Sequence, residues 1–122
     1  MPDAVEDIIA TCHCGTVTIR LPKAPSEITH CNCSLCRRYG VLWAYYEIAD
    51  VVIATKRPTD TYAWGGKNVD FHRCFDCGCV THWYPRKSSR TSLGVNARLL
   101  DQKLLSAADV RYKDSAGTGL FH

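Results

Sequence analysis

The chain has 122 residues, with 15 Lys or Arg and 12 Asp or Glu, so its formal net charge is +3. The basic residues are scattered, which argues against a nucleic-acid partner. No apolar stretch approaches the roughly 20 residues of a membrane-spanning helix, and the first residues lack the features of a signal peptide. We therefore expect a cytoplasmic protein without a membrane partner, formed by a single domain over residues 1–122 with its core at 11–113.

Segments that suit β-strands follow one another along the chain. In the first, residues 15–21, Val17, Ile19 and Leu21 lie on one face and polar residues on the other, the period of a half-buried strand. Further strands are expected at residues 42–48, 51–55, 59–64, 69–73, 79–84 and 91–96. The third and fourth of these flank a Gly-Gly-Lys-Asn sequence at 65–68, which predicts a hairpin.

One short helix is expected at residues 101–105, where Asp101 can cap the first turn. The two ends, residues 1–11 and 114–122, are polar or contain glycine and are expected to be looser. The strands are separated by short turns. The predicted fold class is therefore all-β, with packed antiparallel sheets and at most one short helix.

Eight cysteines are the most informative feature of the chain, and they fall into three clusters. They are Cys12 and Cys14; Cys31, Cys33 and Cys36; and Cys74, Cys77 and Cys79. Two thiolates spaced this closely can reach one ion from a tight turn, and thiolate sulfur selects zinc. The alternative, a disulfide framework, needs an oxidising compartment. Because no signal peptide is evident, the clusters indicate zinc.

The ligand count suggests two metal sites. The pairs Cys12 with Cys14 and Cys74 with Cys77 supply four ligands, the central cluster supplies three, and Cys79 is left over. Four cysteines make a closed structural zinc site, whereas three leave a position open for a substrate. Spacing alone leaves other pairings open, because the 16 residues between Cys14 and Cys31 also suit a single zinc ribbon. Both sites would then be structural.

The order of these motifs resembles a known family. The pattern C-x-C-G, C-x-C-x-x-C-R-R, C-x-x-C-G-C-x-T-H-W and G-V-N-A-R-L-L, between Cys12 and Asp101, is similar to that of the glutathione-dependent formaldehyde-activating enzymes, relatives of centromere protein V. The resemblance implies an all-β fold called a β-tent, built around zinc knuckles. It also implies a structural zinc on Cys12, Cys14, Cys74 and Cys77 and a catalytic zinc, filled fully or in part, on Cys31, Cys33 and Cys36.

The resemblance further implies a carbon–sulfur lyase or synthase that joins formaldehyde, or another small aldehyde, to glutathione as an S-(hydroxymethyl)glutathione-type adduct. A zinc ion with three thiolates is a weak Lewis acid, so a substrate thiol suits its open position better than water. Glutathione carries two carboxylates, which favour basic partners. The expected substrate-binding residues are Arg37 and Arg38, directly after Cys36, and Asn96 and Arg98 in the last motif.

Several other residues invite a functional assignment. His13, His30, His72 and His82 lie near the cysteine clusters, but with seven cysteines placed they are expected to pack or hydrogen-bond rather than bind metal. Cys79 is expected to be a buried small residue. The alternative function is a zinc-stapled binding module without catalysis, in which a fourth Cys or His would complete the central cluster.

Overall fold

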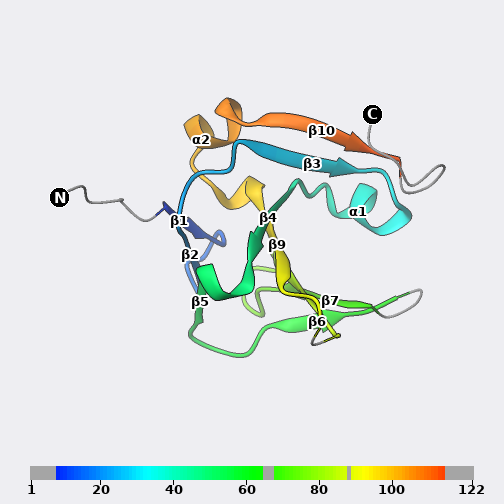
Figure 1. Ribbon diagram of the computed structural model, residues 1–122. Helices are drawn as coiled ribbons and strands as arrows, with labels where there is room; N and C mark the ends of the chain where they lie inside the picture. The colour runs from blue at the N-terminus through cyan, green and yellow to red at the C-terminus, as the bar shows by residue number, and fades with distance from the viewer. Residues whose placement is uncertain (1–7, 65–67, 88, 115–122) are drawn as a thin grey trace.

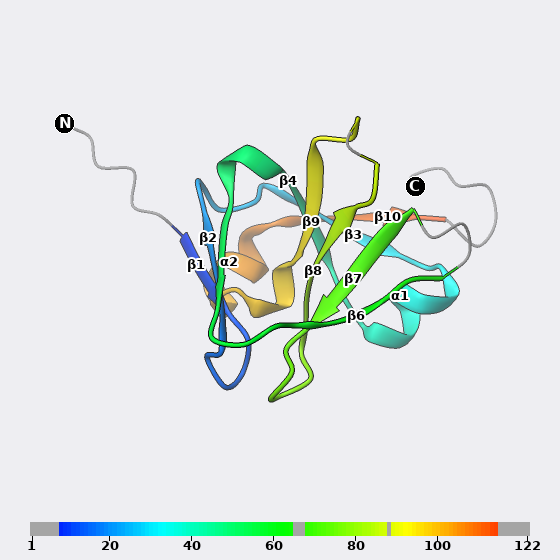
Figure 2. The same cartoon turned by 90° about the horizontal axis from the view of Figure 1, so that it is seen from below.

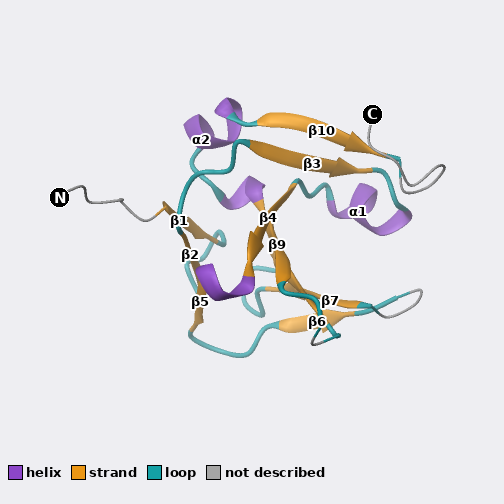
Figure 3. Cartoon of the chain, viewed as in Figure 1, coloured by secondary structure: helices purple, strands orange, loops and turns teal. Residues whose placement is uncertain are grey.

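The computed structural model describes residues 8–64, 68–87 and 89–114. Besides two 3-10 helices at Ile48–Asp50 and Ala97–Leu99, which Figure 3 draws in purple with the other helices, the chain forms ten strands and two short α-helices in these ranges. In chain order they are β1 (Ile8–Thr11), β2 (Val17–Leu21), β3 (Glu27–Cys31), α1 (Ser34–Tyr39), β4 (Trp43–Glu47), β5 (Val52–Thr55), β6 (Asp60–Tyr62), β7 (Val69–Arg73), β8 (Val80–Pro85), β9 (Ser92–Asn96), α2 (Gln102–Ala107) and β10 (Asp109–Lys113). The fold is mostly β, as expected.

The strands form two sheets. The smaller has the order β1-β2-β5, and the larger has the order β10-β3-β4-β9-β8-β7-β6. In Figure 1, β10 and β3 lie at the top, β7 and β6 lie at the bottom, and β4 and β9 connect them. The small sheet and α1 lie on opposite sides of this arrangement, as Figure 2 shows from below. The two ends of the large sheet, β10 with β3 and β7 with β6, therefore lie on opposite sides of α1 in this view.

The large sheet is covered on both faces by apolar residues. On the face toward the small sheet, the main core includes Ile19, Ala44, Leu93 and Val95, each fully buried. A second, smaller cluster lies on the other face and consists of Cys36, Val41, Trp43, Phe71 and Trp83. Because successive strand residues point to opposite faces, β4 contributes Ala44 to the first cluster and Trp43 to the second.

Most of the predicted elements are confirmed. Val17, Ile19 and Leu21 are fully buried on one face of β2, as the alternation required. Strands β6 and β7 pair antiparallel, as the predicted hairpin requires, although residues 65–67 of its turn lie outside the described residues. Helix α2 begins after Asp101, whose carboxylate accepts a hydrogen bond from the Lys103 amide at 2.8 Å.

The expectation of at most one helix was wrong, because α1 is a second one. Its N-cap is Cys33, whose Sγ accepts a hydrogen bond from the Cys36 amide at 3.2 Å. Cysteine is not a usual N-cap residue, and six residues are too few to show a helical period. The start of this helix therefore coincides with a cysteine cluster that we interpreted only as a ligand motif.

The sheets are also not purely antiparallel, because β10 pairs parallel with β3. Neither strand was predicted, and neither was β1, whose residues 8–11 lie in a segment expected to be loose. Strand β10 is exposed along most of its length, and its alternation is short, with only Val110 and Tyr112 between charged residues, so we did not recognise it as a strand. It is held by pairing to β3, and this pairing places Lys113 opposite Cys31.

Candidate metal centres and the adjoining cavity

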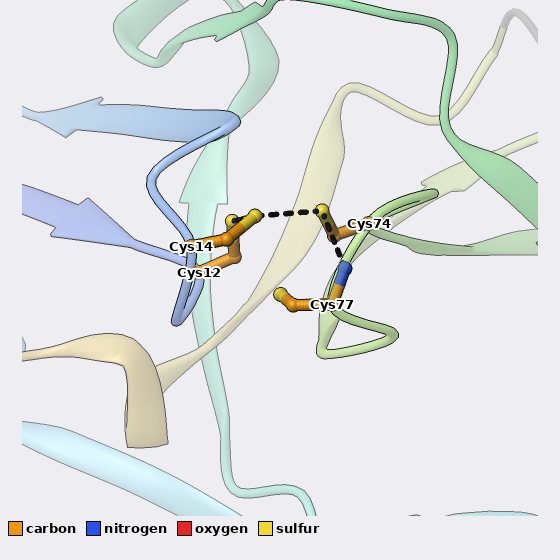
Figure 4. Close-up of side chains that lie close together, drawn as sticks. All are labelled: Cys12, Cys14, Cys74 and Cys77. Carbon is orange, nitrogen blue, oxygen red and sulfur yellow. Dashed lines mark hydrogen bonds between the residues drawn. The ribbon is translucent and has the colours of Figure 1, made fainter.

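Two cysteine clusters are assembled by the fold, and each could hold a metal ion. All eight cysteines lie in the described residues and are free of disulfides. In the first cluster, the sulfur atoms of Cys12, Cys14, Cys74 and Cys77 lie within 4.8 Å of one another. Figure 4 shows the four side chains pointing toward one another from two facing turns.

The sulfur spacing of this four-cysteine cluster suits a tetrahedral ion. The Sγ atoms of Cys12 and Cys14 are 3.8 Å apart, and those of Cys14 and Cys74 are 3.6 Å apart. Zinc–sulfur bonds of about 2.3 Å at tetrahedral angles separate the sulfurs by about 3.8 Å. Cys12 and Cys74 are each only 1% exposed, so the cluster is closed on the side of the core.

In each turn a backbone amide donates a hydrogen bond to a cysteine sulfur and so fixes its position. The Val17 amide donates to Cys12 Sγ at 3.2 Å, and the Cys77 amide donates to Cys74 Sγ at 3.5 Å. A hydrogen bond from the Gly78 amide to the Cys74 carbonyl, at 3.0 Å, closes the second turn. Gly78 has a φ of 78°, which residues other than glycine rarely adopt. These N–H donors favour the thiolate form that a metal requires.

A series of polar contacts leads from the cluster to an ion pair at the surface. Cys14 Sγ lies 3.1 Å from Thr16 Oγ1, which donates to Asp76 at 2.7 Å, and Arg57 pairs with the same carboxylate at 3.0 Å. The contact with Thr16 lowers the pKa of Cys14. Burial raises the pKa of Cys74 to about 11. The surroundings of the cluster therefore shift the pKa values of Cys14 and Cys74 in opposite directions.

The second cluster comes from one short segment. Cys31 ends β3, Cys33 caps α1 and Cys36 lies in its first turn, and their three sulfur atoms lie within 4.8 Å of one another. Trp43 Nε1 donates to Cys36 Sγ at 3.3 Å. The contact with Cys31, together with burial, raises the pKa of Cys36 above its usual range. Three thiolates this close repel one another, and a divalent cation relieves that repulsion.

This three-cysteine cluster differs from the first in two respects. Among the described residues, no fourth Cys, His, Asp or Glu joins it. In addition, all three cysteines line an open cavity of about 350 Å³. The cavity is otherwise lined mainly by the aromatic residues Trp43, Tyr45, Trp64, Phe71 and Trp83 and by the basic residues Arg90 and Lys113. A bound small molecule could therefore reach the sulfur atoms directly.

The expected substrate-binding residues lie elsewhere. Arg37, Arg38, Asn96 and Arg98 are not among the described residues that line this cavity. Arg38, Asn96 and Arg98 come together instead at a second cavity of about 450 Å³, near the C-terminal end of α1. Their contact with a substrate stays a prediction.

The hydrogen bonds of these residues tie elements together. Asn96 donates to the Val80 carbonyl at 2.8 Å and accepts from the Arg98 amide at 3.1 Å. Arg98 Nε donates to the Gly40 carbonyl at the end of α1. Sequence reasoning missed Arg90 and Lys113 because neither is near a cysteine in sequence; they reach the cavity through the loop between β8 and β9 and through the β10–β3 pairing.

The histidines in the described residues form no part of either metal cluster. His72 and His82 stack with ring centroids 4.4 Å apart, and His30 lies against Tyr112 at 5.1 Å. Burial lowers the pKa of His82 to about 3. Cys79 is half-buried against the main core and belongs to neither cluster. In the described residues, no helix has the length and apolar character needed to cross a membrane.

Comparison with known proteins agrees with this arrangement. A crystal structure of a Rhodobacter sphaeroides protein is similar, with a TM-score of 0.67 and 27% identity over 84% of this chain and 99% of the other. No curated protein sequence matches the chain. The family model described as glutathione-dependent formaldehyde-activating enzyme matches residues 7–114, which include both cysteine clusters. The chain therefore belongs to this family.

Proposed function

We propose that the protein is a zinc-dependent carbon–sulfur lyase or synthase that acts on an adduct of glutathione and an aldehyde. The observation that carries this proposal is the position of the three-cysteine cluster in the wall of a cavity. Its thiols are accessible to a small molecule, and no fourth ligand from the described residues closes the site. A binding module would need no such opening.

Both cysteine clusters fit zinc. Thiolate sulfur is the ligand type that selects this metal, and the sulfur spacings in the four-cysteine cluster match a tetrahedral ion. We assign Cys12, Cys14, Cys74 and Cys77 to a structural zinc and Cys31, Cys33 and Cys36 to a catalytic one. At the second cluster, zinc would supply an open coordination position that favours the thiolate form of a substrate thiol.

The side chains around the cluster support a thiol substrate that carries carboxylates. Arg90 and Lys113 line the cavity together with the cysteines. Arginine and lysine pair with carboxylates through charge-assisted hydrogen bonds, and glutathione offers two carboxylates. We propose that these two residues, rather than Arg37 or Arg98, bind the ends of glutathione while its sulfur faces the cysteines.

Tyr45 is the one tyrosine among the described residues that line the cavity, so its hydroxyl can serve the oxygen of the aldehyde. It lines the cavity, and partial burial raises its pKa, so its hydroxyl keeps its proton at neutral pH. In the synthetic direction the substrate sulfur adds to the carbonyl carbon, and the thiol proton ends on the oxygen. In the lyase direction the carbon–sulfur bond breaks and the proton returns to sulfur. We propose that Tyr45 donates a hydrogen bond to this oxygen in both directions.

Exchange spectroscopy by NMR tests the proposal, because it measures the rate at which formaldehyde enters and leaves S-(hydroxymethyl)glutathione at equilibrium. We expect zinc-loaded protein to increase this rate in proportion to its concentration, with saturation in glutathione. Cys33→Ser should abolish the increase, because it removes one ligand of the open cluster. An exchange rate equal to that of the buffer alone, or equal in the wild type and Cys33→Ser, would refute the proposed function.

A further inference from the structure

The cavity beside the three-cysteine cluster has an aromatic floor that formaldehyde does not need. Phe71, Trp83, Gly94 and Tyr45 follow one another across β7, β8, β9 and β4, because each is paired with the next in the strand register. Residues paired in this way point to the same face of a sheet. Three of the four positions therefore carry an aromatic ring on the face that contains the cavity.

Gly94 is the residue that allows this floor to be continuous. A Cβ atom built on Gly94 would collide with Trp83 Nε1 and would lie 2.6 Å from Trp83 Cε2. The indole of Trp83 thus covers the position of the missing side chain and approaches Tyr45, with ring centroids 6.2 Å apart. Trp43 extends the aromatic surface, with its ring 6.0 Å from that of Phe71.

The floor reaches the sulfur atoms on one side and a positive charge on the other. Trp43 Nε1 donates to Cys36 Sγ at 3.3 Å, so the aromatic surface begins at the three-cysteine cluster. The Arg90 guanidinium lies 5.6 Å from the centre of the Trp83 ring. The aromatic surface therefore begins beside the place proposed for the substrate sulfur and extends toward the Arg90 guanidinium.

The adduct of glutathione with formaldehyde has little to offer this surface. Its added group is a single hydroxymethyl carbon, and the glutathione backbone is polar. Aromatic rings in a binding site favour flat apolar groups, which they hold by burial and by edge or stacked contacts. The aromatic floor is therefore evidence about the group attached to the substrate sulfur.

We propose that the substrate adduct carries a flat apolar group, such as an aryl ring, on the carbon bound to sulfur. This inference rests on the proposed function and names the aldehyde class: aromatic or similarly bulky apolar aldehydes in preference to formaldehyde. The reaction is unchanged. The glutathione sulfur adds to the carbonyl carbon of the aryl aldehyde, the thiol proton ends on the oxygen, and the reverse step breaks the same carbon–sulfur bond.

Two stable thioethers test the inference by calorimetric titration of the zinc-loaded protein. S-benzylglutathione and S-methylglutathione share the sulfur and both carboxylates and differ only in the aryl group. We expect the benzyl compound to bind at least tenfold more tightly. Gly94→Ala should reduce this preference, because it forces Trp83 from its position. Trp64→Ala, at a cavity residue that is 40% exposed, should reduce it without threatening the fold.

Tyr112→Ala is the matched control, because Tyr112 is an exposed aromatic residue of β10 that packs against His30 and does not line the cavity. It should leave the preference unchanged. Equal affinity for the two thioethers, in a protein that binds glutathione and accelerates the exchange with formaldehyde, would overturn the inference and leave the proposed function intact. Failure of glutathione and both thioethers to bind would overturn both. A preference that survives in Trp64→Ala and Gly94→Ala would also overturn its assignment to the aromatic residues that line the cavity.

Discussion

Cys77→Ser tests the four-cysteine cluster, which joins two turns that are far apart in the chain. Cys14 and Cys74, whose sulfur atoms are 3.6 Å apart, are separated by 60 residues. A cross-link that closes a loop of this length lowers the conformational entropy of the unfolded state and so raises its free energy by about 4 kcal/mol. Whole domains are stable by only about 5–15 kcal/mol. Serine is a poor zinc ligand, so we expect the variant to lose this zinc and most of that stabilisation.

The measurement is zinc content per chain together with the urea midpoint of unfolding. A loss of about 4 kcal/mol lowers the midpoint by between about 1 and 4 M, given the usual dependence of stability on urea. Cys79→Ser is the matched control, because Cys79 is two residues away and outside the cluster. It should keep both zinc ions. A Cys77→Ser protein with wild-type zinc content and midpoint would refute the assignment, as would an equal loss in Cys79→Ser.

Three further predictions concern the open cluster, the basic residues and pH. Cys33→Ser should lose the second zinc but keep a cooperative urea transition, because Cys31 to Cys36 span only six residues and close no long loop; a collapse as severe as that of Cys77→Ser would favour the binding module. Arg90→Ala should weaken glutathione binding about tenfold in calorimetry and leave an uncharged thiol unaffected, whereas Arg37→Ala should change neither; equal losses would contradict the assignment. Burial lowers the pKa of His82 from 6.5 to about 3. Between these pH values the unfolded chain therefore binds more protons than the folded one, and the free energy of unfolding falls as pH falls, by at most about 1.4 kcal/mol per pH unit. His82→Gln should therefore show a shallower acid loss of stability than the wild type in urea titrations, and an unchanged slope would contradict this reading.

The sequence predicted the metal clusters better than the cavity. Cysteine spacing is a local property and marked the three cysteine clusters, while the resemblance to the family implied the two groups of sulfur atoms that the fold brings together. The residues that line the cavity come from five separate strands and from loops, and only the register of β7, β8, β9 and β4 brings them to one face. Nothing in the local sequence marks Arg90 or Lys113 as neighbours of Cys31.

Arg98 and Asn96 illustrate how a sequence motif leaves the partners of its polar side chains open. Both lie in a motif that resembles the family pattern, and their polar side chains suggested contact with substrate carboxylates. In the structure Asn96 of β9 donates to the Val80 carbonyl of β8, and Arg98, just after β9, donates to the Gly40 carbonyl at the end of α1. A side-chain donor in a sequence motif can bond to a backbone carbonyl or to a ligand, and the tertiary packing determines which partner it meets.

Zinc X-ray absorption spectroscopy with and without glutathione tests the central claim most directly, because it counts the sulfur atoms bound to zinc. In the proposed arrangement the protein would supply seven thiolates to two ions, four from Cys12, Cys14, Cys74 and Cys77 and three from Cys31, Cys33 and Cys36. If a substrate thiol takes the open position, glutathione should raise the total to eight, while S-methylglutathione and the Cys33→Ser variant should show no such rise. A total of eight sulfurs before glutathione is added, or no change on its addition, would contradict an open thiol-binding site.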